Sequence, residues 1–138
     1  MTAKLTAPEI ADFLDEIFPQ ARGMFVIEDA GPLHSRVRMP VDHSHLRPGG
    51  TISGPSMFWL ADCCFYVAVL ASIGRQSEAV TTNMNINFMR RPELKDLTGE
   101  ARIMKLGRRL AVGDVTLYSE GDDRPVAHAA VTYALPGA

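Results

Sequence analysis

Residues 47–74 read "RPGGTISGPSMFWLADCCFYVAVLASIG", a glycine-rich approach to a long apolar run that holds one ionisable acid, Asp62. Pro55 has a fixed φ and no N–H, so it suits the first turn of a helix. Gly74 is typical of the residue that follows a helix. The stretch therefore predicts a helix over residues 55–73 that is apolar on nearly every side.

Such a helix must be covered on nearly every side, and a sheet can provide this cover by curling around it. Where the sheet leaves part of the helix uncovered, a second subunit can supply the remainder. The rest of the chain should therefore contain the strands of a curved sheet.

Extended segments occur on both sides of the apolar helix. In one of them Met84, Ile86 and Phe88 alternate with asparagines, the period of a strand with one buried face. The turns between the later segments are short enough for consecutive strands to be antiparallel neighbours. The segments are residues 24–31 and 33–40 before the helix, and 79–90, 97–106, 109–119 and 125–135 after it. This order predicts an α+β fold with an antiparallel sheet rather than a βαβ fold.

The N-terminal segment, residues 1–22, contains apolar residues at helical spacing between Pro8 and Pro19 and predicts a short amphipathic helix. Its acidic residues argue against a secretory signal, so we expect it to be part of the fold. Residues 40–55 hold three prolines and three glycines and predict an irregular loop. The whole chain, residues 1–138, has the length of a single domain.

The composition of the chain limits the kinds of partner that it can bind. The formal net charge of −2 and the pI near 6.0 argue against nucleic acid. Asp62 lies near the centre of the apolar run, a costly place for a charge in lipid, so we expect no membrane span. The adjacent Cys63 and Cys64 suit neither an ordinary disulfide nor a zinc site, and they fit a reducing cytoplasm. His43 and His45 lack further ligands at a recognisable spacing, so we expect no metal.

The start of the apolar helix has the features of an oxyanion hole. Amides at a helix N-terminus point outward with partial positive charge, and Gly54 has no side chain to obstruct a carbonyl oxygen that approaches its N–H. The alternative is that Gly49, Gly50 and Gly54 only allow tight turns. Asp62 favours a functional reading, because an apolar residue would serve stability more easily, although a structural hydrogen bond would also explain it.

Gly54 and Asp62 are eight residues apart, which is about 12 Å of rise along one helix. Both therefore cannot act on the same carbonyl carbon from one chain. Antiparallel helices related by a two-fold axis would bring Gly54 of one chain near Asp62 of the other.

The segment from His45 to Asp62, followed by "TTNMNINFM" and "KLGRRLAVGDVTLY", resembles the hotdog-fold acyl-CoA thioesterases of the phenylacetate-degradation (PaaI-like) type. The resemblance covers about residues 40–135 and implies a curved antiparallel sheet around a central helix. It also implies hydrolysis of an acyl-CoA thioester by a homodimer at minimum, with a homotetramer expected. Coenzyme A is then part of the substrate, and no cofactor is implied.

By this resemblance, Asp62 would be the general base or the nucleophile, and the Gly54 amide of the other subunit would polarise the thioester carbonyl. Thr81 falls where the family often has a serine or threonine that orients the attacking water. Arg47 and Ser53 stand where the family usually has an asparagine and a histidine. Arg47 would bind a substrate carboxylate or phosphate, or pair with Asp62 across the interface.

Two small basic patches match the phosphates of coenzyme A. One is formed by Arg90 and Arg91, and the other by Arg108 and Arg109 beside Lys105. In the family, the turn that resembles "KLGRRL" lies along the nucleotide. We also expect Ser53 and Gly50 to contact the substrate.

Two other functions are compatible with the sequence. In the first, Arg47 and Ser53 mark a hotdog protein that binds an acyl-CoA or another small ligand without turning it over. The second is a hotdog dehydratase or hydratase, which would need a catalytic histidine near the helix. No histidine lies within residues 53–73, so thioester hydrolysis is the favoured function.

Overall fold

A computed structural model of the chain describes residues 1–136. Its central helix, α2 (Gly54–Ile73), begins after Ser53, whose hydroxyl caps the helix by accepting a hydrogen bond from the Ser56 N–H. The helix ends at Gly74, which has a positive φ of 95°. The helix predicted from the apolar run is confirmed, and it starts one residue earlier than predicted, at Gly54.

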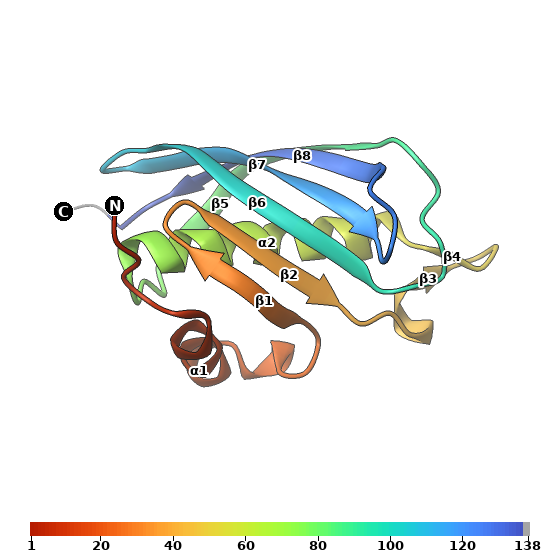
Figure 1. The fold of residues 1–138 in the computed structure, drawn as a ribbon, viewed down its shortest axis with the longest axis horizontal. Coiled ribbons are helices and arrows are strands. Elements are labelled where there is room, and N and C mark those ends of the chain that lie inside the picture. Colours follow the sequence, from red (N-terminus) through yellow and green to blue (C-terminus); the bar gives the residue numbers. More distant parts are fainter. Residues whose placement is uncertain (137–138) are drawn as a thin grey trace.

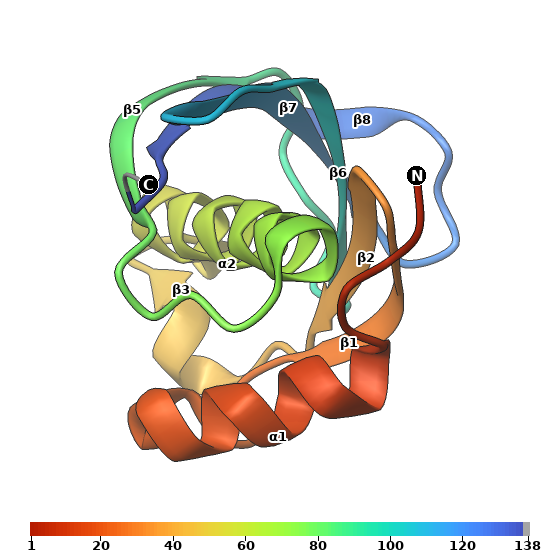
Figure 2. The ribbon, with the colours of Figure 1, turned by 90° about the vertical axis from the view of Figure 1, so that its left-hand side faces the viewer.

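A six-stranded antiparallel sheet curls around α2, as Figures 1 and 2 show. The strand order is β1-β2-β6-β7-β8-β5. The strands are β1 (Val26–Gly31), β2 (His34–Met39), β5 (Val80–Phe88), β6 (Leu97–Leu106), β7 (Leu110–Ser119) and β8 (Pro125–Ala134). The expected curved sheet wrapped around a long apolar helix is confirmed.

The strand order corrects one prediction. Strands β5 and β6 were expected to be hairpin neighbours, but β6 lies between β2 and β7, whereas β5 pairs only with β8 at the sheet edge. The connection of residues 89–96 instead runs along the end of the sheet (Figure 1). The amides of Met89 and Arg90 both donate to the carbonyl of Val126, so the chain stays beside β8 before it crosses.

Residues 40–55 are more regular than predicted. They contain a 3-10 turn, η2 (His43–His45), and a hairpin of two very short strands, β3 (Leu46–Arg47) and β4 (Thr51–Ile52). Gly49 and Gly50 close this hairpin with φ values of 98° and 76°, which favour glycine. Strands of two residues are too short to show a period in the sequence.

The N-terminal segment forms the predicted helix, α1 (Ala7–Ile17), followed by the 3-10 turn η1 (Pro19–Ala21). Thr6 and Glu9 form a capping box at its start, in which each side chain accepts from the backbone amide of the other. Its apolar face is buried, and Figure 2 shows that it lies below β1 and α2.

The sheet and α1 leave one side of α2 incompletely covered. Beyond the first turn, the residues of α2 that are not fully buried fall on one helical face, which we call the open face: Phe58, Trp59, Asp62, Cys63, Tyr66 and Ile73. In Figure 2 the sheet curves over α2 and α1 lies below it, whereas the side between α1 and the edge strand β5 shows only the segment labelled β3 and the loop that follows α2. The helix is long and apolar enough to cross a membrane, yet most of it is buried, so it serves as a core helix.

Candidate active site

The Asp62 carboxylate accepts two hydrogen bonds on the same oxygen. The Thr81 hydroxyl donates to Oδ1 at 2.5 Å, and the Tyr133 hydroxyl donates to Oδ1 at 2.7 Å. Thr81 of β5 and Tyr133 of β8 are directly opposite in the sheet register, so both side chains reach α2 from the same face. Within residues 1–136 no donor contacts Oδ2, which leaves that oxygen available for chemistry.

Tyr133 is a site residue that the sequence analysis missed. Its ring is buried between Phe65 and Tyr66, with centroid distances of 5.3 and 6.0 Å. Burial, and then the nearby charge of Asp62, raise the pKa of Tyr133 far above its usual range. The phenol therefore remains a hydrogen-bond donor at every physiological pH.

The Gly54 amide has no hydrogen-bond partner among the described residues. Of the first four residues of α2, Gly54 alone has an N–H group that no described residue accepts. Pro55 has no N–H. The Ser56 amide donates to the Ser53 hydroxyl, and the Met57 amide donates to the Ser53 carbonyl at 3.2 Å. One outward-pointing amide thus remains at the positive end of the helix.

Two cavities meet at Gly54 and Phe88. The first, the apolar cavity, has a volume of about 670 Å³ and is lined by Gly54, Pro55, Phe58, Trp59, Asp62, Ile86 and Phe88. The second, the basic cleft, has a volume of about 620 Å³ and includes Arg47, Arg90 and Arg91 in its lining. A carbonyl group at the Gly54 amide would lie where the two cavities join.

Not all the predicted site residues lie together. Ser53 and Gly50 line neither cavity: Ser53 caps α2, and Gly50 shapes the β3–β4 hairpin. Arg108 and Arg109 lie in the β6–β7 turn, which Figure 1 shows at the other end of the sheet from β3 and β4. Substrate contact by these four residues stays a prediction.

The described residues contain no group of three side chains that could hold a metal ion. His45 is buried, and its Nδ1 accepts a hydrogen bond from the Asp42 amide in η2. That contact gives His45 a structural role in the loop that precedes α2.

The sequence profile of the thioesterase superfamily matches residues 49–126, which include Gly54, Asp62, Thr81 and the greater part of the sheet. The chain belongs to the thioesterase superfamily. It is thus a hydrolase that acts on thioesters, and the resemblance to the PaaI-like hotdog proteins is confirmed.

Solved structures agree with this assignment. A candidate thioesterase from Silicibacter sp. is 49% identical, with a TM-score of 0.90, and the match covers 97% of this chain and 94% of the other. The PaaI protein of E. coli, from the phenylacetic acid degradation operon, is 22% identical with a TM-score of 0.82, over 95% and 94% of the two chains. At that identity the similarity shows the hotdog fold alone.

A candidate esterase of Saccharolobus solfataricus is 28% identical to this thioesterase over 102 residues, which are 74% of this chain and 67% of the relative. These comparisons give the fold and the class of reaction.

Proposed function

We propose that this thioesterase hydrolyses acyl-CoA at a site shared by two subunits. The Asp62 carboxylate of one chain acts as the general base, and the Gly54 amide of the other chain binds the thioester oxygen. The observation that carries the proposal is that Oδ2 of Asp62 and the N–H of Gly54 form no hydrogen bond within residues 1–136, while both residues line the apolar cavity.

In this mechanism Oδ2 of Asp62 takes a proton from water, and the water oxygen attacks the thioester carbon. The developing oxyanion is stabilised by the Gly54 N–H. The C–S bond then breaks, the thiolate takes up the proton that Asp62 holds, and the carboxylic acid leaves. The Thr81 hydroxyl donates to Oδ1, so its lone pairs can accept a hydrogen bond from the attacking water.

The dimer is supported by the incomplete cover of α2. Phe58 is 39% exposed on the open face, and Phe88 is 51% exposed at the end of β5. Strand β5 also forms one edge of the sheet, with no strand on its outer side among the described residues. A second copy related by a two-fold axis would cover both features and place its Asp62 near Gly54. A tetramer built from such dimers stays a prediction, as does the cytoplasmic location.

The second basic patch, at the β6–β7 turn, is suited to bind the phosphates of coenzyme A. In an antiparallel pair of helices, the β6–β7 turn of one subunit lies at the same end as the α2 N-terminus of the other. Arg108 and Arg109 of that turn would then meet the phosphates of a substrate whose carbonyl sits at Gly54. Arg90 and Arg91 lie nearer, beside Gly54 in the basic cleft. The reaction needs no cofactor beyond the coenzyme A of the substrate.

Substitution of Asp62 tests the proposed base. Asp62→Asn and Asp62→Ala should both reduce kcat by at least about a hundredfold across a panel of acyl-CoAs, because general base catalysis contributes about 10²–10⁴. Full hydrolysis by both variants would exclude Asp62. Incorporation of oxygen-18 into Asp62 during turnover in labelled water would show direct attack by the carboxylate instead of base catalysis.

Gly54→Pro tests the proposed oxyanion hole, because it removes the N–H at the first helical position. Ser53 is extended, with φ of −75° and ψ of 151°, a conformation that accepts a following proline. Gly54→Ala is the matched control, since it keeps the N–H and adds a Cβ in the same place, 3.3 Å from Phe88 Cζ. Gly54→Pro should lower kcat by roughly 10²–10³ more than Gly54→Ala, and equal effects would argue against the amide.

A further inference from the structure

The cations of this chain divide into two sets. Of the 14 lysines and arginines, seven form ion pairs with carboxylates: Arg22, Arg36, Arg38, Arg75, Lys95, Arg102 and Arg124. Within residues 1–136 the others have no such partner, and apart from Lys4 they form two clusters. One consists of Lys105 near the end of β6 with Arg108 and Arg109 in the β6–β7 turn, and the other is the basic cleft with Arg47, Arg90 and Arg91.

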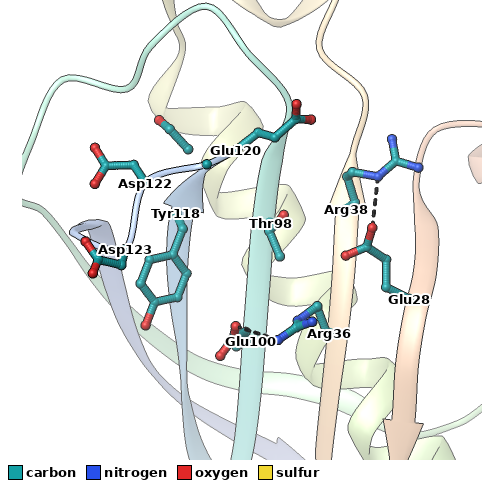
Figure 3. A pocket seen from close by; sticks show the side chains of 11 residues that line it. Glu28, Arg36, Arg38, Thr98, Glu100, Tyr118, Glu120, Asp122 and Asp123 are labelled. Atoms are coloured by element: carbon teal, nitrogen blue, oxygen red, sulfur yellow. Dashed lines mark hydrogen bonds and ion pairs between the residues drawn. The ribbon is translucent and has the colours of Figure 1, made fainter.

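Although the charge of Arg90 also acts on Asp122, no carboxylate among residues 1–136 lines the basic cleft. Its other lining residues are small or apolar, among them Pro48, Gly49, Thr51, Ile52, Met57 and Met89. A pocket of about 670 Å³ on the outer face of the sheet is different, because its arginines are neutralised (Figure 3). There Arg36 pairs with Glu100 at 3.4 Å, and Arg38 pairs with Glu28 at 3.1 Å.

Arg47, Arg90 and Arg91 reach the cleft from two parts of the backbone, the β3–β4 hairpin and the segment that follows β5. Arg47 is the register partner of Thr51 in the β3–β4 hairpin, three residues before Gly54. Arg90 is fixed at the end of β5, where its amide donates to the Val126 carbonyl, and Arg91 precedes the buried Pro92. An anion between these groups would have several charged donors, and Arg forms bidentate pairs with carboxylates.

The position of the cleft indicates which part of a substrate carries that anion. Gly54 also lines the cleft, so an anion bound beside Arg47 would share one cavity with a carbonyl at the Gly54 amide. The phosphates of coenzyme A are much farther from the thioester, because the whole pantetheine arm separates them. A carboxylate on the acyl group would therefore fit this position better than the phosphates.

We propose that the basic cleft binds a carboxylate carried by the acyl chain, and that the preferred substrates are CoA thioesters of short dicarboxylic acids. The inference rests on the proposed function, since it places the thioester carbonyl at Gly54. The second cluster, at the β6–β7 turn, would bind the phosphates of coenzyme A.

The test compares substrates of equal chain length with and without a terminal carboxylate, glutaryl-CoA against pentanoyl-CoA. The wild type should have a kcat/KM for glutaryl-CoA at least about tenfold higher than that for pentanoyl-CoA, because a factor of about ten corresponds to the free energy of one charge-assisted hydrogen bond. Arg47→Gln and Arg91→Gln should each reduce this preference by about tenfold or more, mainly through the KM for glutaryl-CoA. The control Arg22→Gln, which loses a solvent-exposed ion pair with Asp15, should keep the wild-type preference.

Three outcomes would overturn the inference. One is a wild type that hydrolyses pentanoyl-CoA as well as glutaryl-CoA. Another is an Arg47→Gln variant with an equal loss on both substrates, which would assign the cleft to the phosphates. The third is an unchanged preference in both cleft variants. None of these affects the proposed function, which is tested separately by full hydrolysis of both substrates in Asp62→Asn and Asp62→Ala.

Discussion

The hydroxyl of Tyr133 donates a hydrogen bond to Oδ1 of Asp62 at 2.7 Å, although 71 residues separate the two in sequence. The same hydroxyl lies 3.1 Å from the Asp62 backbone carbonyl. Together with Thr81, Tyr133 fixes the carboxylate in one orientation. We regard Tyr133 as a positioning residue, because its hydroxyl contacts the proposed base and not the proposed position of the carbonyl.

Tyr133→Phe should lower kcat by about tenfold to a hundredfold, which corresponds to the ~1.5–3 kcal/mol of a hydrogen bond to a charged group. KM should stay within about twofold, because the ring still packs on Phe65 and Tyr66. Steady-state kinetics on one acyl-CoA measures both parameters.

The matched control is Tyr66→Phe. It removes a hydroxyl from the neighbouring stacked ring, where that hydroxyl donates to the Gln76 carbonyl at 2.9 Å. It should leave kcat near the wild-type value. If both variants lost the same activity, the effect of Tyr133 would be one of packing rather than of orientation.

The open face of α2 predicts a variant that dissociates the dimer. Phe58→Glu places a charge at a residue that is 39% exposed in the single chain but buried in the proposed dimer. Its chain should fold, elute as a monomer in size-exclusion chromatography with light scattering, and lose hydrolysis. Leu94→Glu is the control, since Leu94 is 65% exposed in the β5–β6 connection and should leave the dimer intact. A fully active Phe58→Glu monomer would refute the shared site.

Burial of Cys64 predicts the alkaline limit of stability. Burial raises the pKa of the Cys64 thiol from 9.0 to about 12. Below pH 9 the thiol is protonated in both the folded and the unfolded state, so its burial contributes fully to the free energy of unfolding. Between pH 9 and about 12 only the unfolded state loses the proton, so the free energy of unfolding falls with rising pH.

The measurement is urea unfolding at several pH values for the wild type and for Cys64→Ala. The wild-type free energy of unfolding should fall more steeply above pH 9, by up to ~1.4 kcal/mol per pH unit. The difference between the wild-type and Cys64→Ala curves isolates the effect of Cys64 from that of the other buried groups that titrate in this range. Parallel curves would show that Cys64 ionises equally in both states.

The sequence predicted the parts of the site that lie on α2. Asp62 is the only ionisable acid in the apolar run, and Pro55 marks the start of the helix and so the position of the Gly54 amide. Tyr133 escaped notice because its alternation with Ala129 and Val131 is also the pattern of core residues. One signal was available, since a buried tyrosine hydroxyl usually needs a hydrogen-bond partner.

The strand order could not be predicted in the same way. The connection of residues 89–96 has a hairpin's length, but pairing is decided by contacts far apart in sequence. Strand β6 pairs with β2, and Val37 of β2 lies opposite Gly99 of β6, although all of α2 separates these two residues in the sequence. The β3–β4 hairpin was missed because two-residue strands carry no period. It nevertheless places Arg47 at the basic cleft.

Subunit complementation tests the shared site most directly. One chain carries Asp62→Asn and the other Gly54→Pro, each inactive alone, and mixed dimers are isolated with two different affinity tags. If each site combines Gly54 of one chain with Asp62 of the other, one of the two sites in a mixed dimer is intact. We predict about half of the wild-type kcat per dimer. A mixed dimer as inactive as its parents would contradict the account.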